Sequence, residues 1–439
     1  MRYNQHRQLL SARNFSYRVK AGIYSALLCC VVVNSASGAR AESVGSTTKP
    51  AVQAASDSAL ADSAAVRTQN LIDSGLGFLK SKQLDDGGWA SERMPPAVTA
   101  LVLRAFVRDA AYTAETDFVH RGFDRLLQFQ LDDGGIYKDL LANYNTAIAI
   151  SALSYVPGDR FKPQIDRAIA YLKRLQWTPE TRPEFSDAKE TQTGQQVVKD
   201  EKDPFYGGFG YGGRSRGAGR PDLSNVQMTL DALHDAGVPA SDPAIQRALA
   251  FVTRTQNFSE TNDQSWSGND GGFVYGPSDN RQGESFAGEF TDDAGQRRLR
   301  SYGSMTYAGL KSFIYAGLSK DDPRVVAAWN WINSNWSLDE NPGMRAGNPD
   351  NARHGYFYYL HTLARTLNEY DEPTITLSDG SKIDWRVALI DKLASLQQDD
   401  GSWVGEKRWM EDSPIIVTSY VVNALQDLQE DLKQHPAKQ

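Results

Sequence analysis

One short pattern recurs along the chain and constrains its fold more than any other feature. A helix-forming stretch ends in Gln and is followed by a Gly-containing turn and, six positions after the Gln, by an apolar residue. Copies that keep this register occupy 83–89, 130–136 and 397–403, and weaker copies end at Gln176, Gln256 and Trp336. The six key positions are 47, 46, 80, 80 and 61 residues apart. The sequence therefore predicts six units of about 46 residues with insertions.

Each unit also contains a second helical stretch, richer in Ala, Leu, Val and Tyr and less charged than the first. Such a composition is expected of a helix that packs on most of its sides. The first helices are therefore predicted to form an outer ring and the second helices an inner ring. The predicted inner helices span 97–108, 144–156, 224–236, 303–316, 356–370 and 415–428.

The glycines explain why the first helix of each unit stops, because Gly readily takes the left-handed conformation that closes a helix C-terminus. The Asp pairs of these turns, at 85–86, 132–133 and 399–400, are then predicted to be solvated or capping groups rather than catalytic acids. The Gly-rich run 207–213 stands at the same place in its own unit. We interpret it as a structural turn rather than a phosphate-binding loop.

The Gln, Gly-x-Trp arrangement of 83–89 and 397–403 resembles the QW repeat of squalene–hopene cyclases and of protein prenyltransferase β subunits. The resemblance covers roughly residues 68–430 and implies an all-α fold, an (α/α)6 toroid of six outer and inner helical hairpins. In that superfamily the Gln, Gly and aromatic residues of the motif tie neighbouring helices together. The resemblance thus implies structural roles for Gln83, Gly87, Trp89, Gln130, Gln397 and Trp403.

Neither chemistry of that superfamily has its complete motif here. Triterpene cyclases that begin by protonation share an Asp-x-Asp-Asp motif, and the nearest string, 289–294, has Glu289 in place of the first Asp. Protein prenyltransferases hold zinc with Asp, Cys and His, but the two cysteines lie at 29 and 30, inside the predicted export signal. His354 and His361 have no acids near them at ligand spacing. No metal and no cofactor is predicted, and whether the chain is an enzyme stays open.

The N-terminus has the order of basic, apolar and small residues that is typical of an export signal. Residues 2–20 carry five basic residues and no acid, 21–33 are uncharged, and 39–41 read Ala-Arg-Ala. We expect a signal peptide at 1–41, a flexible leader rich in Ala, Ser and Thr at 42–66, and the toroid at 67–432. The predicted location is the periplasm or the medium, and an uncleaved anchor is the alternative.

Charge and hydropathy narrow the range of partners. Cleavage after Ala41 leaves 41 Lys and Arg against 54 Asp and Glu, a net charge of about −13, so nucleic acid is not an expected partner. No segment after the export signal reaches the roughly 20 apolar residues of a membrane span. The expected partner is a small molecule, of the isoprenoid class if the resemblance extends to the ligand.

Aligning the predicted inner helices places a polar residue at one shared position in all six. These residues are Arg104, Ser151, Asp231, Lys311, Arg365 and Asn423. Because outer helices enclose the inner ones, this stripe is expected to face the central axis. It predicts either a hydrated, mixed-charge cavity or a buried salt-bridge plug at one end of the barrel. A terpenoid cyclase is expected to have an aromatic, uncharged lining, so the stripe counts against a squalene-like substrate.

Two long insertions, about 178–223 and 258–302, each connect an outer helix to the next inner helix, so they are expected to share one rim. Their arginines, together with helix N-termini, favour an anionic group, although the many acids of the same insertions leave surface charge balance as the alternative. The predicted ligand-binding residues are Asn225, Gln227, Tyr307, Tyr358, Tyr420, Arg365, Arg214, Arg216 and Arg220.

Asp231 and His361 are the candidates for a general acid or base, since burial tunes either residue type toward neutral pH. The leading hypothesis is an exported, terpenoid cyclase-like repeat protein that binds a ligand, an anionic isoprenoid, in its central cavity. One alternative is a non-catalytic binding or scaffold protein. The other is a glycan-active toroid enzyme, whose carboxylates would come from Asp222, Asp231 and Asp412.

Overall fold

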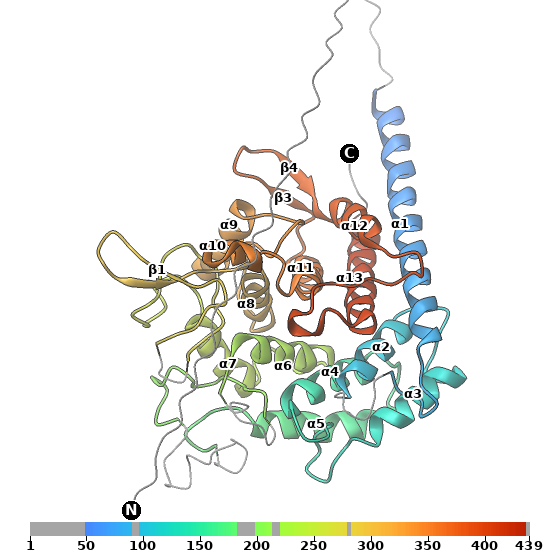
Figure 1. Cartoon of the computed structure of the whole chain (residues 1–439), viewed down its shortest axis with the longest axis horizontal. Helices are drawn as coiled ribbons and strands as arrows, with labels where there is room; N and C mark the ends of the chain where they lie inside the picture. The colour runs from blue at the N-terminus through green and yellow to red at the C-terminus, as the bar shows by residue number, and fades with distance from the viewer. Residues whose placement is uncertain (1–48, 90–95, 182–197, 213–219, 279–281, 436–439) are drawn as a thin grey trace, which may run out of the picture. The chain divides into compact units, whose positions relative to one another are not determined.

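The structure is a computed structural model that describes residues 49–89, 96–181, 198–212, 220–278 and 282–435. The elements below belong to the compact unit 50–439, apart from the first residue of α1. Six helices form a closed inner ring in which each contacts the next and the last contacts the first (Figure 1). They are α2 Ala97–Val107, α4 Ala142–Ser154, α6 Leu223–Asp235, α8 Gly303–Tyr315, α11 Tyr356–Tyr370 and α13 Pro414–Gln434.

An outer helix precedes each inner helix in the chain. The outer helices are α1 Lys49–Ser81, α3 Asp117–Leu127, α5 Lys162–Arg174, α7 Pro243–Thr253, α9 Pro323–Ser334 and α12 Trp385–Leu396. Their apolar faces pack on the inner ring, as α3 shows by burying Phe118, Val119, Phe123 and Leu126. The predicted all-α toroid of outer and inner hairpins is confirmed, and the predicted inner helices agree with the observed ones except that α13 runs six residues further.

Short elements lie in the connections between these helices. Two antiparallel hairpins pair β1 Glu289–Thr291 with β2 Arg297–Leu299, and β3 Thr374–Thr376 with β4 Lys382–Asp384. A four-residue helix, α10 Met344–Gly347, and 3-10 turns at Pro349–Asn351 and Arg408–Met410 complete the elements of the described residues. Within the same ranges, no helix has both the length and the apolar character that crossing a membrane requires.

The boundary of the predicted leader is corrected. Helix α1 begins at Lys49, so residues 49–66 are helical where the sequence predicted a flexible leader at 42–66. The alanines of this stretch favour helix formation, which explains the difference. Packing of the helix on the barrel is described from Ala64 onward, where Ala64 and Thr68 are buried. Residues 1–48, with the predicted signal peptide, lie outside the described part of the chain.

The Gln of four repeats joins two neighbouring outer helices through its side-chain amide. Gln83 Nε2 donates to the Gly87 carbonyl of its own turn at 2.8 Å and to the Phe118 carbonyl in the first turn of α3 at 2.7 Å. The same pair of contacts is made by Gln130, Gln176 and Gln256, whereas Gln397 donates to its own turn. This is the tie between helices that the resemblance implied.

The tryptophans of the first and last repeats form hydrogen bonds from their turns to the preceding helix. The buried indoles of Trp89 and Trp403 donate from Nε1 to the carbonyls of Leu79 and Leu393 at 2.6 and 2.8 Å. The second Asp of each turn pair caps the turn, as Asp86 Oδ1 does by accepting from the Gly88 N–H at 2.9 Å, and Asp133 and Asp400 do likewise. The structural interpretation of these Asp pairs is confirmed.

Close approach between turn and neighbouring helix explains the glycines. Gly207 has φ +79°, and a Cβ there would lie 1.9 Å from the Arg247 carbonyl oxygen of α7. Gly87 has φ +88°, and its Cβ would lie 2.6 Å from the Arg121 carbonyl oxygen. Residues 207–212, the described part of the Gly-rich run, thus form a structural turn as predicted.

Replacing Gly207 with Ala is expected to reduce the free energy of unfolding by roughly 2–4 kcal/mol, through left-handed strain plus the collision with Arg247. Gly237→Ala is the matched control, because Gly237 has φ +72° and nothing within 4 Å of an added Cβ. Urea unfolding of both variants measures the difference. Equal losses of stability would show that the close approach at Gly207 contributes nothing.

Candidate functional site

The interior of the inner ring is divided along its axis into two layers of different chemistry. The first turns of the six inner helices, with the connections that precede them, surround a cavity of about 390 Å³. The last turns of the same helices meet in a buried network of charged side chains. The sequence left open whether the polar stripe lines a hydrated cavity or forms a buried plug, and this division answers that question.

The cavity is aromatic and uncharged over the described residues that line it. Its aromatic lining consists of Tyr144, Tyr211, Tyr275, Phe286, Tyr302, Tyr358, Trp409 and Tyr420. The other lining residues are Ala97, Val98, Leu101, Leu141, Asn145, Ile148, Ser224, Ser304, Met305, Met410 and Ile416. The volume falls within the roughly 300–1,000 Å³ of small-molecule sites. Apolar walls with a few hydroxyl and amide groups are typical of a site for a largely apolar ligand.

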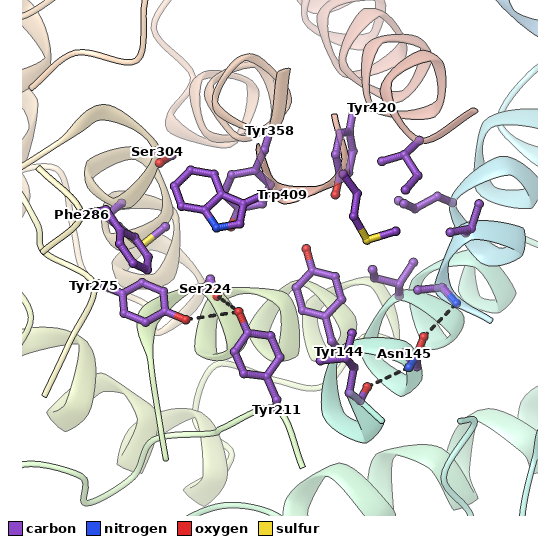
Figure 2. Close-up of a pocket in the computed structure, with 18 of the residues that line it drawn as sticks. Tyr144, Asn145, Tyr211, Ser224, Tyr275, Phe286, Ser304, Tyr358, Trp409 and Tyr420 are labelled. Carbon is purple, nitrogen blue, oxygen red and sulfur yellow. Dashed lines mark hydrogen bonds between the residues drawn. The ribbon is translucent and has the colours of Figure 1, made fainter. Parts of the chain in front are cut away.

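Tyrosine hydroxyls supply most of the polar atoms of this cavity (Figure 2). The Tyr358 hydroxyl accepts a hydrogen bond from Gln227 Nε2 at 2.8 Å. Burial raises the pKa of Tyr144 and Tyr358 well above the ordinary value and that of Tyr420 to about 12. These hydroxyls therefore stay protonated and uncharged at neutral pH.

A second group of hydroxyls leads from the cavity wall to the buried carboxyl of Asp222. The hydroxyls of Tyr211 and Tyr275 lie 3.2 Å apart, and Ser224 Oγ donates to Asp222 Oδ1 at 2.6 Å. Asp222 also caps α6 by accepting from the Asn225 N–H at 3.0 Å. Burial raises the pKa of Asp222, although these donors act in the opposite direction.

The connection 404–413, here called the strap, forms the outer wall of the cavity. Trp409 and Met410 line the cavity from it, and both have left-handed backbone, with φ +54° and +67°. That conformation costs about 1–2 kcal/mol for each residue with a side chain. The buried carboxylate of Glu411 anchors the strap, because its Oε1 accepts from the Tyr358 N–H of α11 at 2.8 Å. Burial raises the pKa of Glu411 to about 7.

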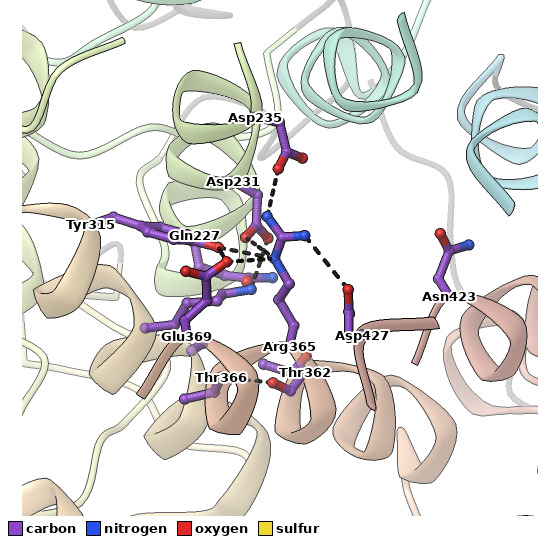
Figure 3. A network of polar contacts seen from close by, with 12 residues as sticks. Gln227, Asp231, Asp235, Tyr315, Thr362, Arg365, Thr366, Glu369, Asn423 and Asp427 are labelled. Carbon is purple, nitrogen blue, oxygen red and sulfur yellow. Dashed lines mark hydrogen bonds and ion pairs between the residues drawn. The ribbon is translucent and has the colours of Figure 1, made fainter. Parts of the chain in front are cut away.

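The charged network is centred on Arg365 of α11 (Figure 3). Its guanidinium forms an ion pair with Asp235 of α6 and donates to the hydroxyls of Tyr155, after α4, at 2.7 Å and of Tyr315, in α8, at 3.0 Å. Asp427 of α13 lies 3.7 Å from the same guanidinium. A single side chain thus contacts residues of four other inner hairpins.

Other ion pairs surround this centre and balance its charge. Lys311 Nζ lies 2.8 Å from Asp231, and Arg108 Nη2 lies 2.7 Å from Asp427. Burial raises the pKa of Asp427, but the charges of Arg108 and Arg365 outweigh burial and hold that pKa well below its ordinary value. The stripe that includes Arg104, Asp231, Lys311 and Arg365 is therefore the buried plug, one of the two interpretations left open by the sequence, and not the lining of a hydrated cavity.

His361 lies between the two layers. Its ring stacks on Tyr420, with centroids 5.3 Å apart and an angle of 20° between the planes. Burial lowers its pKa to about 3, and the positive charge of Arg104 acts in the same direction. The imidazole is uncharged at neutral pH. Its candidate role as an acid or base, and that of Asp231 inside the network, stay predictions that no cavity contact supports.

The predicted ligand-binding residues fall into distinct places. Tyr358 and Tyr420 line the cavity, whereas Gln227 and Asn225 lie directly behind the lining, bound to Tyr358 and to Asp222. Two placements are corrected. Tyr307 is buried against Tyr359 in the core, and Arg365 belongs to the plug, because both lie on faces that neighbouring inner helices cover.

Two arginines of the predicted rim pair with acids. Arg220 pairs with Glu284 at 2.6 Å, and Arg298 pairs with Asp292 at 2.8 Å, so these arginines meet acids of the insertions rather than the cavity. Arg214 and Arg216 lie outside the described residues. Surface charge balance, the alternative interpretation, fits Arg220 and Arg298.

Sequence reasoning missed most of the aromatic lining. Tyr144 stands seven positions before Ser151 of the polar stripe, as the predicted Tyr358 stands seven before Arg365, and that shared position was an available signal. Tyr211, Tyr275 and Trp409 come from connections without periodicity, so no pattern pointed to them. The described residues also contain no group of three or more His, Cys, Asp or Glu that could hold a metal ion.

Comparisons with known proteins concern the fold. No family model matches the chain, and no curated protein matches it. A solved unsaturated glucuronyl hydrolase specific for heparin aligns over 85% of this chain and 99% of its own, with 12% identity and a TM-score of 0.52. The chain has the α/α-toroid fold. The type II terpene cyclase MstE from Scytonema aligns over 83% of this chain and 99% of its own, with 16% identity and a TM-score of 0.49.

A substitution in the plug is expected to affect stability and not ligand binding. Asp427→Asn removes the buried carboxylate that Arg108 and Arg365 share and leaves one positive charge of the network uncompensated, although Glu430 and Asp235 stay as partners. The free energy of unfolding should fall by about 3–5 kcal/mol. Asp391→Asn is the control, because its partner Arg67 and Asp391 are both exposed, so the loss should stay below about 1 kcal/mol. Equal effects in denaturant unfolding would contradict the account of the plug.

His361 makes stability depend on pH in a defined window. Between its ordinary pKa of 6.5 and the lowered value of about 3, the unfolded chain binds a proton that the folded chain does not. The free energy of unfolding therefore falls as the pH falls through this window. His361→Phe keeps a ring beside Tyr420 and removes the effect, so its loss of stability between pH 7 and 5 should be smaller than wild type's by about 2 kcal/mol. Parallel pH profiles would contradict this.

Proposed function

We propose that the protein binds an uncharged, hydrocarbon-rich ligand of the isoprenoid class in the aromatic cavity. The observation that carries the proposal is the lining itself, in which aromatic and aliphatic side chains dominate and no described residue is charged. Burial of apolar surface contributes roughly 25 cal/mol per Å², so such walls favour a hydrocarbon over a strongly hydrated molecule. Export by the signal at 1–41 is part of the same proposal.

The position of the charged side chains supports an isoprenoid over the alternatives. The polar stripe counted against a squalene-like substrate only if it lined the cavity, and it belongs to the plug instead. The remaining lining is the aromatic, uncharged surface expected for terpenoid ligands. The QW-like repeats, which imply that superfamily from sequence, point to the same class of ligand.

An anionic head group has no cationic partner among the described lining residues. Arg220 and Arg298 are each paired with an acid, so neither offers the open guanidinium that a diphosphate needs. The neutral form of an isoprenoid therefore fits the cavity better than the anionic form that the sequence suggested. Binding, rather than one particular reaction, is the function that this geometry supports.

A glycan-active enzyme is less well supported. Hydrolysis of glycosides needs two carboxyl groups facing each other across the substrate. Of the three candidates, Asp231 is paired with Lys311, Asp222 is held behind the cavity wall, and Asp412 is exposed. None of them lines the described cavity.

The proposal predicts that filling the cavity abolishes binding. Val98 lines the cavity at the start of α2, so Val98→Phe should reduce squalene or farnesol affinity at least tenfold by occupying the ligand's volume. Val326→Phe on outer helix α9 is the control, because Val326 is 41% exposed and far from the lining. Thermal shifts with the purified protein measure both, since a ligand at a hundred times its Kd adds about 2.7 kcal/mol. Shifts that survive Val98→Phe, or appear only with acidic glycans, would overturn the proposal.

A further inference from the structure

We propose that the strap, residues 404–413, is the gate of the cavity, held closed by the buried carboxyl of Glu411 and released when that carboxyl loses its proton. The inference rests on the proposed function, because the molecule that passes the gate is the ligand of the cavity. The position of the strap, its attachment to α11 and the surroundings of Glu411 lead to this conclusion.

The strap separates the cavity from solvent. Trp409 and Met410 line the cavity, and they are also 42% and 41% exposed, so each residue faces the cavity on one side and solvent on the other. The Trp409 indole packs on Phe286, with ring centroids 5.2 Å apart (Figure 2). Phe286 lines the cavity from a different connection. Movement of the strap away from Phe286 would therefore open the cavity at this point.

The side chain of Glu411 attaches the strap to α11. Its Oε1 accepts from the Tyr358 N–H at 2.8 Å. In the described part of the chain, the other hydrogen bonds of residues 404–412 lie within the strap, such as that from the Gly405 N–H to the Glu411 carbonyl at 2.7 Å. The strap can therefore move as one closed loop once its bond to α11 breaks.

The backbone of the strap favours release. Trp409 and Met410 have φ +54° and +67°, in the left-handed region that residues with side chains avoid. Gly355, the N-cap of α11, lets the indole lie against the backbone, because a Cβ there would lie 2.7 Å from Trp409 Cε3. Strained conformations of this kind persist only while the surrounding contacts hold them. Opening relieves the strain.

The second oxygen of Glu411 explains why a proton holds the strap closed. Glu411 is 1% exposed, and its Oε2 is buried without a hydrogen-bond partner among the described residues. A Cβ added at Gly405 would lie 3.0 Å from this oxygen and 3.0 Å from Phe357 Cδ2, so the site is crowded and apolar. A buried carboxylate oxygen without a donor is costly, whereas the protonated carboxyl is neutral and still offers Oε1 to the Tyr358 N–H.

The groups around Glu411 support the same direction. Burial, with Glu406 of the strap acting in the same sense, raises the pKa of Glu411 to about 7, and the amides at the start of α11 oppose this without cancelling it. The neighbouring titratable groups are Tyr356 of α11 and Tyr420 of α13. Both are uncharged at neutral pH, because burial raises the pKa of each to about 12.

The sign of the pH dependence follows from the two states of the strap. In the open strap the Glu411 carboxyl is in water, where its pKa has the ordinary value of 4.5. Between pH 4.5 and 7 the closed strap binds a proton that the open strap does not. Opening is therefore favoured as the pH rises through this window, and closing as the pH falls through it.

Thiol labelling inside the cavity measures opening without any ligand. Ser304 lines the cavity and is 3% exposed, so Ser304→Cys is introduced into the full chain with Cys29→Ser and Cys30→Ser. Methyl methanethiosulfonate is the probe, and its labelling rate is compared with and without Glu411→Gln, which cannot ionise. The ratio of the two rates should rise at least about tenfold between pH 5.5 and 8.5. The thiol chemistry cancels in this ratio.

Three further variants complete the experiment. Asp412→Asn is the matched control, because Asp412 is the exposed acid next to Glu411 and its loss should leave the rise unchanged. Glu411→Ala removes the acceptor for the Tyr358 N–H and should speed labelling at both pH values. Val326→Cys, an exposed thiol on α9, normalises the profile of the native strap, which should show the same rise.

The outcomes separate the gate from the proposed function. A ratio that stays constant between pH 5.5 and 8.5 would overturn the inference and leave the proposed function intact. Farnesol is uncharged, so its association rate, measured by stopped flow, should rise with pH in parallel with the labelling rate. Labelling that follows the predicted course while no isoprenoid probe binds would support the gate and overturn the proposed function.

Discussion

The ion-pair network around Arg365 determines which part of the barrel interior is filled by charged side chains and which part forms the cavity. The Arg365 guanidinium contacts Asp235, Tyr315 and Asp427, which belong to hairpins far apart in the sequence (Figure 3). It also donates to the Tyr155 hydroxyl. A buried charge of this kind is tolerated only when its partners are complete. The inner helices therefore meet around it in their C-terminal halves, and the described cavity lies at their N-terminal ends.

This division gives the cavity its chemistry. The charged side chains of the inner helices pair with one another in the network. The first turns of these helices can therefore present aromatic and aliphatic side chains to the cavity. The connections then close that space with Tyr211, Tyr275 and the strap residues Trp409 and Met410. The strap keeps two residues in left-handed conformation, held by Glu411 on the N-terminus of α11. Backbone strain of this kind is often found next to binding sites.

The fold was predictable because its signals are local and repeated. The side-chain amides of Gln83 and Gln256 make the same two bonds in different units, and each turn needs its glycine for the same close approach. The polar stripe was also read correctly as facing the axis. Its chemistry stayed open between a hydrated cavity and a buried plug, because Asp235 and Asp427, which complete the ion pairs, stand outside the aligned position.

The candidate site was less predictable for a physical reason. Tyr358 and Tyr420 could be proposed because they stand near the starts of inner helices, but Tyr275 and Trp409 come from connections whose path is set by tertiary contacts. The same contacts neutralise Arg220 and Arg298, which appeared from sequence to be ligands for an anion. The acid that pairs with Arg220 is 64 residues away in the sequence and leaves no local pattern, whereas the partner of Arg298 is only six residues away.

The most direct test of the central claim is the ratio of two affinities, those for farnesol and for farnesyl diphosphate, measured on the same preparation at low and high salt. The cavity lining is uncharged and the charges of the plug pair with one another. The account therefore predicts that farnesol binds at least tenfold more tightly than farnesyl diphosphate, with an affinity that salt does not weaken. Tighter binding of the diphosphate, weakened by salt, would show that an exposed cationic site holds the ligand and would contradict the account.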